Sequence, residues 1–267
     1  MKNFIIYGLA RSGTSNLAAA LANGKLNDKV IQEPFLKKTG DIQRFRWLAE
    51  LQNEFGFFPK NRLGGEGCVF SGGQLNTNRF LDELYKKNVG IKHVFSSVPN
   101  AIINAQLINY VASHNIKVIF LRRRSIFDPA ISSVLACQHG FWGWRENTRD
   151  ILDNFKYEPI DINFILEAAE SMYSARCTAE LKVSQKVIKE NLLSFYYEDL
   201  YSTDRDERHK NFDAICDFIE LDRSDLLEET VCWQFLNDNK QNKNSNLSRI
   251  SNYKEILKLY ELYPHLA

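Results

Sequence analysis

The sequence lacks the features that define several classes of protein. Its formal net charge is only +1, which leaves no basic surplus for general nucleic-acid binding. Its five cysteines are odd in number and include no C-x-x-C pair, so a reduced, cytoplasmic protein fits best. No apolar run approaches the roughly 18 residues of a membrane span, and the apolar segment after Asn3 is too short for a signal peptide. We therefore expect no transmembrane segment, no nucleic-acid partner and a small-molecule ligand.

The residues that are present are typical of a globular domain. Of the 267 residues, 44% are apolar and 25% are charged, and we find neither an internal repeat nor a clear linker. Short apolar runs alternate with helix-forming segments, which indicates parallel β-α-β crossovers. The expected strands are 4–7, 30–32, 90–95, 117–121 and 192–196, and the expected helices include 17–22, 78–87, 100–114, 162–190 and 253–263. This pattern predicts an α/β fold, a P-loop-like three-layer α/β/α arrangement with a central parallel sheet, in a single domain of residues 1–267.

The turn between the first strand and the first helix, Gly8 to Ser15, has the composition of a phosphate-binding loop. A glycine-rich turn at a helix start gathers backbone N–H groups and the positive end of the helix dipole at one point. The spacing of Gly8 and Gly13 matches the start of a Walker A motif, but Thr14 stands where that motif needs lysine. A cation lies inside the loop instead, at Arg11. The hydroxyl donors of the loop are Ser12, Thr14 and Ser15.

The residues after the strand 117–121 also distinguish this chain from an NTPase. An NTPase usually carries an aspartate at such a strand end to help hold magnesium, whereas this strand is followed by Arg122–Arg124. Three cations repel a metal ion and attract a phosphate, whose oxygens a guanidinium group can bind in pairs. The sequence therefore predicts two anion sites for one nucleotide and no metal site.

These residues carry a resemblance to the sulfotransferase family. The loop Gly8–Ser15 is similar to the family's 5′-phosphosulfate loop, and Arg124 with Ser132 eight residues on is similar to its 3′-phosphate motif. The resemblance implies 3′-phosphoadenosine 5′-phosphosulfate (PAPS) as cofactor, 3′,5′-ADP as product and a single sulfotransferase domain over nearly the whole chain. Further local similarity to bacterial carbohydrate and glycolipid sulfotransferases is found at Glu33–Phe35, Ala136–Trp142, Tyr197–Leu200 and Ser251–Ile256.

The resemblance also assigns roles in cofactor binding. Arg11 is the candidate for stabilising the leaving phosphate, because sulfuryl transfer can proceed on cationic side chains and loop N–H groups without a metal. Arg123 and Ser133 lie one step from the 3′-phosphate pair and remain alternatives to it. Lys240 and Arg249 are further candidates for covering that phosphate. The expected cofactor-binding residues are Arg11, Ser12, Gly13, Thr14, Ser15, Arg124 and Ser132.

The acceptor hydroxyl must lose its proton as it attacks sulfur, so a base is needed nearby. Glu33 is the first choice, because similar bacterial enzymes place a glutamate base in this motif, and His93 is the rival, because cytosolic relatives use a histidine. Lys92 is a candidate for contacting the bridging oxygen. Because adjacent strand residues face opposite ways, we expect only one of Lys92 and His93 to reach the site.

The predicted function is transfer of a sulfuryl group from PAPS to a hydroxyl of a carbohydrate, glycolipid or small metabolite. The alternatives are a P-loop nucleotide kinase or NTPase, and a nucleotide-binding protein without turnover. Flat apolar side chains suit a sugar or lipid acceptor, and each of them is equally suited to the core. The aromatic candidates are Phe35, Trp47, Phe57, Phe58, Trp142 and Trp144.

Overall fold

The computed structural model describes residues 1–23, 29–35, 45–55, 57–59, 68–70, 73–96, 101–140, 155, 157–226 and 248–267. The strands are β1 (Phe4–Gly8), β2 (Val30–Gln32), β3 (Phe57–Pro59), β4 (Cys68–Phe70), β5 (Gly90–Val94), β6 (Lys117–Arg122) and β7 (Leu192–Tyr196). The α-helices are α1 (Thr14–Leu21), α3 (Arg46–Glu54), α4 (Gly73–Tyr85), α5 (Ala101–Ser113), α6 (Phe127–His139), α8 (Ile162–Lys186), α9 (Tyr197–Leu200), α10 (Arg205–Phe218) and α13 (Tyr253–Leu262). Two short 3₁₀ helices are η3 (Lys189–Asn191) and η4 (Arg223–Asp225).

The main sheet has five strands in the order β2-β5-β1-β6-β7, and every neighbouring pair in it is parallel. Gly8 at the end of β1 pairs with Val94 of β5 and with Leu121 of β6, so these three strands end at the same edge. The strands β3 and β4 form a separate antiparallel pair. The central parallel sheet expected from the sequence is therefore confirmed.

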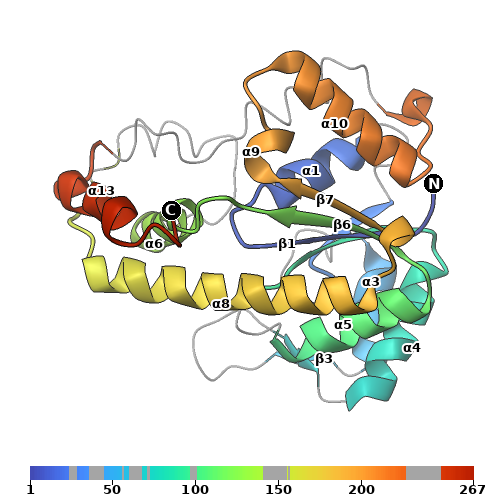
Figure 1. The fold of residues 1–267 in the computed structure, drawn as a ribbon. Coiled ribbons are helices and arrows are strands. Elements are labelled where there is room, and N and C mark those ends of the chain that lie inside the picture. Colours follow the sequence, from blue (N-terminus) through green and yellow to red (C-terminus); the bar gives the residue numbers. More distant parts are fainter. Residues whose placement is uncertain are drawn as a thin grey trace.

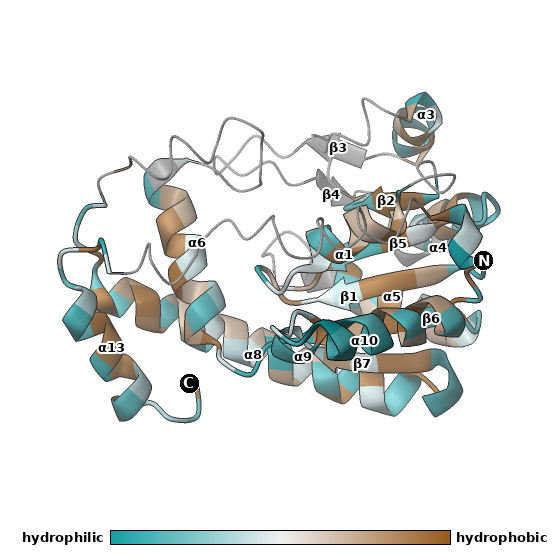
Figure 2. Cartoon of the chain, turned by 90° about the horizontal axis from the view of Figure 1, so that it is seen from above, coloured by the Kyte–Doolittle hydropathy of each residue, from teal (hydrophilic) through white to brown (hydrophobic). Residues whose placement is uncertain are grey.

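Helices cover both faces of this sheet (Figure 1). Along β1, Phe4 and Ile6 pack into a cluster with residues of α1 and α10, whereas Ile5 and Tyr7 pack into a larger cluster with residues of α5, α6 and α8. This alternation is the two-residue period of a strand, and both of its faces are apolar because both are buried. The result is the predicted three-layer α/β/α arrangement. In Figure 2 the central strands are mostly hydrophobic and α10 on the outside is mostly hydrophilic.

Local capping explains where the outer helices begin. The Asp161 carboxylate accepts a hydrogen bond from the Asn163 N–H and caps α8, and the Asp204 carboxylate accepts from the Asp206 N–H and caps α10. Such caps satisfy backbone donors that have no partner within the helix. Within the described ranges, no helix combines the length and the apolar character that a bilayer crossing needs.

The expected strands and helices are present within a few residues of the predicted bounds. The α-helices and strands that the sequence patterns did not predict are α3, α6, α9, α10, β3 and β4, of which α6 carries Ser132 and α9 carries the motif Tyr197–Leu200. We expected residues 124–132 only as a motif after a strand, and the structure continues them into α6. Pro129 in the first turn of α6 does not interrupt the helix, because N–H groups there have no intrahelical acceptor.

The connections that follow the central strands diverge at the carboxyl end of β1. The connection after β1 leads to α1 on one face of the sheet, whereas the connections after β5 and β6 lead to α5 and α6 on the other face. Strand ends whose connections diverge in this way leave room between them, which is where open α/β sheets bind ligands.

The start of β5 gives a test of the packing between the strands. A Cβ atom at Gly90 would lie 2.1 Å from Cζ of Phe4, whose ring is fully buried and cannot move aside. Gly90→Ala is therefore expected to lower the free energy of unfolding by about 1–3 kcal/mol, as overpacking does. Urea denaturation measures this change. The control Ser184→Ala, on the exposed side of α8, is expected to stay within about 0.5 kcal/mol of wild type, and equal effects of the two would contradict the packing.

Candidate functional site

The β1–α1 loop is held tightly by its own backbone. The Ser12 side chain is fully buried, and both its N–H and its hydroxyl donate to the Leu9 carbonyl. The Ala10 N–H donates to Ser96 Oγ at 2.9 Å, which ties the loop to the segment after β5. Gly13, the N-cap of α1, has no side chain with which to cap the helix. The first N–H groups of α1 are thus presented in the way that suits an anion.

Neighbouring side chains lie too close to Gly8 and Gly13 to leave room for a Cβ atom at either position. A Cβ at Gly8 would lie 2.4 Å from Cγ2 of Thr14, and one at Gly13 would lie 2.5 Å from Cε2 of Tyr201. Gly13 also has a φ of 75°, in the left-handed region that favours glycine. The Tyr201 hydroxyl donates to the Gly13 carbonyl at 2.6 Å. Tyr201 was not among the predicted site residues, although it follows the motif Tyr197–Leu200 directly.

Arg11 and Ser132, 121 positions apart in the sequence, are in direct contact. Nε of Arg11 donates a hydrogen bond to Ser132 Oγ at 2.9 Å. Burial, and then the charge of Arg123, lower the pKa of Arg11 to about 10, so the guanidinium group remains charged at neutral pH. The cation expected at the 5′-phosphosulfate and the hydroxyl expected at the 3′-phosphate therefore lie together above the carboxyl edge of the sheet.

The structure separates the two neighbouring arginines at the end of β6. Arg123 is turned inward, where its Nη2 donates to the Arg11 carbonyl at 3.1 Å and its guanidinium lies 3.7 Å from the centre of the Tyr197 ring. Arg124 is turned outward with 54% of its side chain exposed, and its Nη2 lies 2.7 Å and 2.9 Å from the two carboxylate oxygens of Asp199. Arg123 therefore holds the loop through the Arg11 carbonyl, whereas Arg124 faces solvent.

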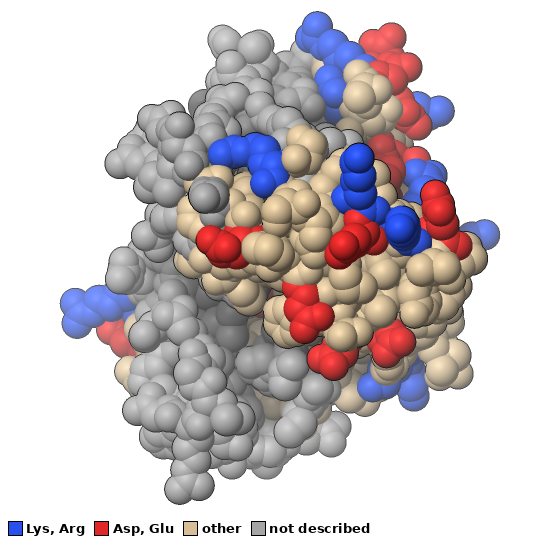
Figure 3. All heavy atoms as spheres, turned by 90° about the vertical axis from the view of Figure 1, so that its left-hand side faces the viewer, with Lys and Arg blue, Asp and Glu red and all other residues tan. Residues whose placement is uncertain are grey.

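Acidic side chains accompany the arginines on this side of the molecule. Glu198 accepts from the Arg124 N–H at 3.1 Å and pairs with Arg123 at 3.4 Å. Figure 3, which faces the side on the left of Figure 1, shows basic and acidic side chains intermixed over the described surface. The described part of this face therefore carries no large area of a single charge sign.

A second group of candidate residues lies at the ends of β2 and β5. Glu33, which follows β2, is 7% exposed, and its Oε1 lies 2.9 Å from Lys92 Nζ. Its Oε2 lies 3.9 Å from His93 Nδ1 and accepts the Val94 N–H at 3.4 Å. Lys92 and His93 both face this carboxylate, but only Lys92 Nζ lies within hydrogen-bond distance of it, and the expectation that only one of the two reaches the site stays a prediction. Glu33 stands past the end of the three-residue edge strand, where a flexible lysine chain can reach it.

His93 is fixed inside the core. Its ring is fully buried, is stacked on Tyr7 with centroids 5.8 Å apart and meets the edge of Phe35 at 5.5 Å. Its Nε2 lies 2.7 Å from Oδ1 of Asn104, a residue of α5 that the sequence analysis did not select. Burial lowers the pKa of His93 below its ordinary value.

Two of the predicted site residues have an unusual backbone conformation. Among the described residues, the non-glycine residues with positive φ are Arg11, Glu33, Asn88, Asn115 and Glu220. Asparagine tolerates this region, whereas arginine and glutamate rarely adopt it. Strained residues persist where surrounding contacts determine them, and they cluster at functional sites.

The remaining candidates are placed as follows. Arg249 donates to the Phe155 carbonyl at 2.9 Å, so part of its guanidinium is engaged by the backbone. Phe35 is fully buried in the core, and Trp47 is partly buried against Phe45. Within the described ranges, no group of three or more His, Cys, Asp or Glu side chains could hold a metal ion. The side chains of Phe57, Phe58, Trp142, Trp144 and Lys240 lie outside the described part of the structure.

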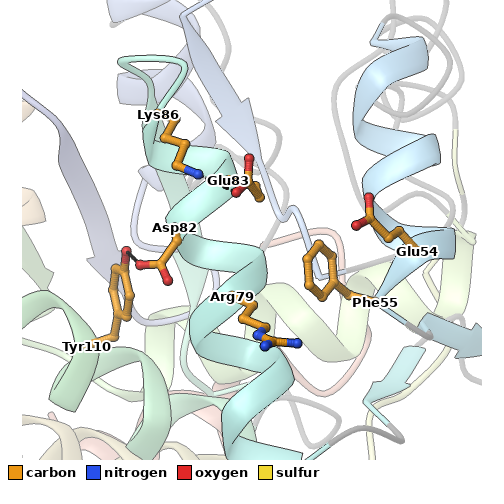
Figure 4. Close-up of a pocket in the computed structure, with 7 residues that line it drawn as sticks. All are labelled: Glu54, Phe55, Arg79, Asp82, Glu83, Lys86 and Tyr110. Atoms are coloured by element: carbon orange, nitrogen blue, oxygen red, sulfur yellow. Dashed lines mark hydrogen bonds and ion pairs between the residues drawn. The ribbon is translucent and has the colours of Figure 1, made fainter.

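A surface cavity of about 510 Å³ lies elsewhere, among α3, α4 and α5 (Figure 4). Its charged groups include close internal pairs: Lys86 pairs with Glu83, and the Tyr110 hydroxyl donates to Asp82 at 2.7 Å. None of the predicted site residues lines it, and we assign it no role in the chemistry. The residues that line it are Glu54, Phe55, Arg79, Asp82, Glu83, Lys86 and Tyr110.

The buried histidine predicts a pH dependence of stability. Because the folded chain binds a proton at His93 less readily than the unfolded chain, this stability is fully present above the ordinary pKa of 6.5 and is lost as the pH falls below it. His93→Gln is expected to lose less unfolding free energy than wild type between about pH 7.5 and about pH 5.5 in urea titrations. His114→Gln, at a half-exposed histidine, is the control and should follow wild type. Parallel losses in wild type and His93→Gln would contradict the burial of a neutral imidazole.

Comparisons with known proteins give matches among solved structures only. No family model matches the sequence, and no curated protein matches it. The sulfotransferase domain from the curacin biosynthetic pathway is 13% identical with a TM-score of 0.44, over 83% of this chain and 75% of that chain. A sulfotransferase from Alicyclobacillus acidocaldarius is 14% identical with a TM-score of 0.47, over 100% of this chain and 94% of that chain. The sulfotransferase domain from the Synechococcus PCC 7002 olefin synthase is 15% identical with a TM-score of 0.40, over 98% of this chain and 94% of that chain.

All three of these proteins are sulfotransferases, the family that the sequence motifs resemble. Because the identities are 13–15% and the TM-scores lie below 0.5, these matches do not assign a function to this chain, and the proposed function rests on its own residues.

Proposed function

We propose that the chain is a sulfotransferase that moves a sulfuryl group from PAPS to a hydroxyl of a carbohydrate, glycolipid or small metabolite, with 3′,5′-ADP as the second product and residues 1–267 acting as one domain. The observation that carries the proposal is the contact between Arg11 Nε and Ser132 Oγ at 2.9 Å. It brings together the two motifs that the family uses for one nucleotide. A donor with phosphates at both its 5′ and its 3′ position needs two anion sites this close.

The 5′ site consists of the β1–α1 loop. The uncapped start of α1 supplies backbone N–H groups, Thr14 and Ser15 supply hydroxyls, and Arg11 supplies a positive charge that burial keeps away from water. Charge that develops on the leaving phosphate is stabilised by such fixed donors and cations. PAPS would supply the sulfuryl group, and the loop would hold the 5′-phosphate to which that group is attached.

The 3′ site is assigned to Arg124 and Ser132. Arg123 is occupied by the Arg11 carbonyl and by Glu198, so it serves the loop rather than a ligand. Arg124 is paired with Asp199 and lies 4.9 Å from the centre of the Tyr196 ring, and a phosphate dianion would compete with the Asp199 carboxylate for the guanidinium group. Ser132, in the second turn of α6, presents its hydroxyl at the same edge.

Glu33 is assigned as the base. The acceptor oxygen forms a bond to sulfur while the bond from sulfur to the 5′-phosphate oxygen breaks, and the electron pair leaves with the phosphate. The hydroxyl proton passes to the Glu33 carboxylate. Lys92 Nζ, 2.9 Å from Oε1, holds that carboxylate in place. β5, which carries Lys92, lies between β2, which Glu33 follows, and β1, which the loop follows, so base and loop lie at the same edge of the sheet with one strand between them.

The two alternatives are less well supported. A kinase or NTPase needs the lysine that Thr14 replaces and a carboxylate for magnesium where Arg122–Arg124 stand. A nucleotide-binding protein without turnover would not need a glutamate in a strained conformation beside a buried lysine. Loss of the Glu33 charge would lower the turnover of an enzyme but would leave the behaviour of a non-catalytic nucleotide-binding protein unchanged.

The nucleotide assignment is tested by thermal denaturation with 3′,5′-ADP and with 5′-ADP. A ligand that binds only the folded chain raises the apparent melting temperature. We expect a larger rise with 3′,5′-ADP, and Arg124→Ala should abolish the difference between the two nucleotides. Arg223→Ala is the matched control, because Arg223 is 50% exposed and paired with Asp213 at 2.8 Å, and its ion-pair partners, Asp213 and Asp217, both belong to α10 and not to the motifs. Equal shifts from both nucleotides in wild type would contradict the 3′ site.

The role of Glu33 is tested by transfer of ³⁵S from labelled PAPS to a panel of hydroxyl acceptors. Glu33→Gln keeps the shape of the side chain but removes the base, so we expect kcat to fall by about 10²–10⁴-fold with binding of 3′,5′-ADP unchanged. Glu220→Gln is the matched control: Glu220 also has a positive φ, of 52°, and pairs with Lys2 at 2.6 Å. Wild-type turnover in Glu33→Gln would exclude Glu33 as the base.

A further inference from the structure

The orientation of the Asn104 amide fixes the proton on His93. Nδ2 of Asn104 donates to the Phe95 carbonyl at 2.7 Å, so its Oδ1 is the atom that faces His93 Nε2 at 2.7 Å. The reverse orientation would set the amide oxygen against a carbonyl oxygen. Because Oδ1 can only accept, the neutral imidazole carries its proton on Nε2 and leaves a lone pair on Nδ1.

That lone pair is buried without a hydrogen bond. Nδ1 has no hydrogen-bond partner among the described residues, and the ring is fully buried. A buried acceptor without a hydrogen bond costs free energy. A donor that reaches Nδ1 in another protonation state of its neighbours would remove that cost. Oε2 of Glu33 lies 3.9 Å from Nδ1. As a carboxylate, Glu33 cannot supply that donor.

One proton on Glu33 completes the arrangement. A protonated carboxyl group has an O–H that can donate to Nδ1, and a shift of about 1 Å from the present 3.9 Å brings the two atoms to hydrogen-bond distance. Lys92 occupies Oε1, whereas Oε2, which accepts the Val94 N–H at a longer 3.4 Å, is the oxygen that faces Nδ1 and takes the proton. The charged groups that face His93 are Glu33 and Lys92, and its ring is fixed by Tyr7 and Phe35. A buried imidazole stays neutral and therefore remains an acceptor.

We propose that His93 is a positioning residue for Glu33: its Nδ1 accepts a hydrogen bond from the Glu33 carboxyl group after Glu33 has taken the proton of the acceptor hydroxyl. The inference rests on the function proposed above. In the step, the O–H bond of the acceptor breaks, an O–H bond forms on Oε2, and this proton is shared with Nδ1 until water removes it after the products leave. His93 itself, buried in the core, touches neither substrate.

Two substitutions at one position test which ring nitrogen matters. His93→Asn places an amide oxygen near the position of Nδ1, whereas His93→Gln places its amide near Nε2 and offers Glu33 no acceptor. Both remove the ring and its contacts with Tyr7 and Phe35, so each controls for the other's loss of packing. In ³⁵S-PAPS assays with water or a hydroxyl acceptor, we expect kcat to fall about tenfold in His93→Gln and to recover most of that loss in His93→Asn, with KM unchanged.

The outcomes separate this inference from the proposed function. Absence of sulfuryl transfer in wild type would overturn the function, whereas transfer with equal kcat in the two variants would overturn only the role of Nδ1. A measurement without turnover uses ¹⁵N-histidine spectra, in which His93 is identified among five histidines by its loss in His93→Gln. We expect the Nε2-protonated form in wild type and a hydrogen-bonded Nδ1 in Glu33→Gln, whose amide imitates the protonated acid. A proton on Nδ1 in wild type would refute the inference.

Discussion

The parallel register of β1 between β5 and β6 is the constraint on which the candidate site depends. Gly8 pairs with Val94 on one side and with Leu121 on the other, so the loop after β1 begins where both neighbouring strands end. The same register brings Arg123 and Ser132 to one side of the loop and Lys92 to the other. A shift of register by one residue would turn every side chain of β1 to the opposite face and separate these groups.

Long-range contacts then hold the loop in a conformation that its own residues disfavour. Arg11 has a φ of 61°, and its carbonyl is held by the Arg123 guanidinium while its side chain is held by Ser132. Tyr201 fixes the Gly13 carbonyl from a third direction. These contacts fix the position of the Arg11 cation before any ligand binds. The site therefore needs little rearrangement when negative charge develops on the leaving phosphate. Glu33, with a φ of 49°, is held in the same manner by Lys92 and Val94.

The sequence predicts the parts of this structure that depend on local pattern. The buried strands are continuous apolar runs, and the glycine spacing of the loop identifies the turn after β1, so both could be predicted. The distinct roles of Arg123 and Arg124 could not, because they are set by Tyr197, Glu198 and Asp199 from the segment after β7. Asn104 was missed for a similar reason: a polar residue on a helix gives no signal until the helix is packed against the His93 ring.

A crystal structure of the chain with 3′,5′-ADP would show whether one nucleotide spans the two motifs. We expect the 5′-phosphate at the start of α1, in contact with the Arg11 guanidinium, and the 3′-phosphate within hydrogen-bond distance of Arg124 and Ser132. A nucleotide bound in the cavity among α3, α4 and α5, or one whose 3′-phosphate points into solvent, would contradict this expectation.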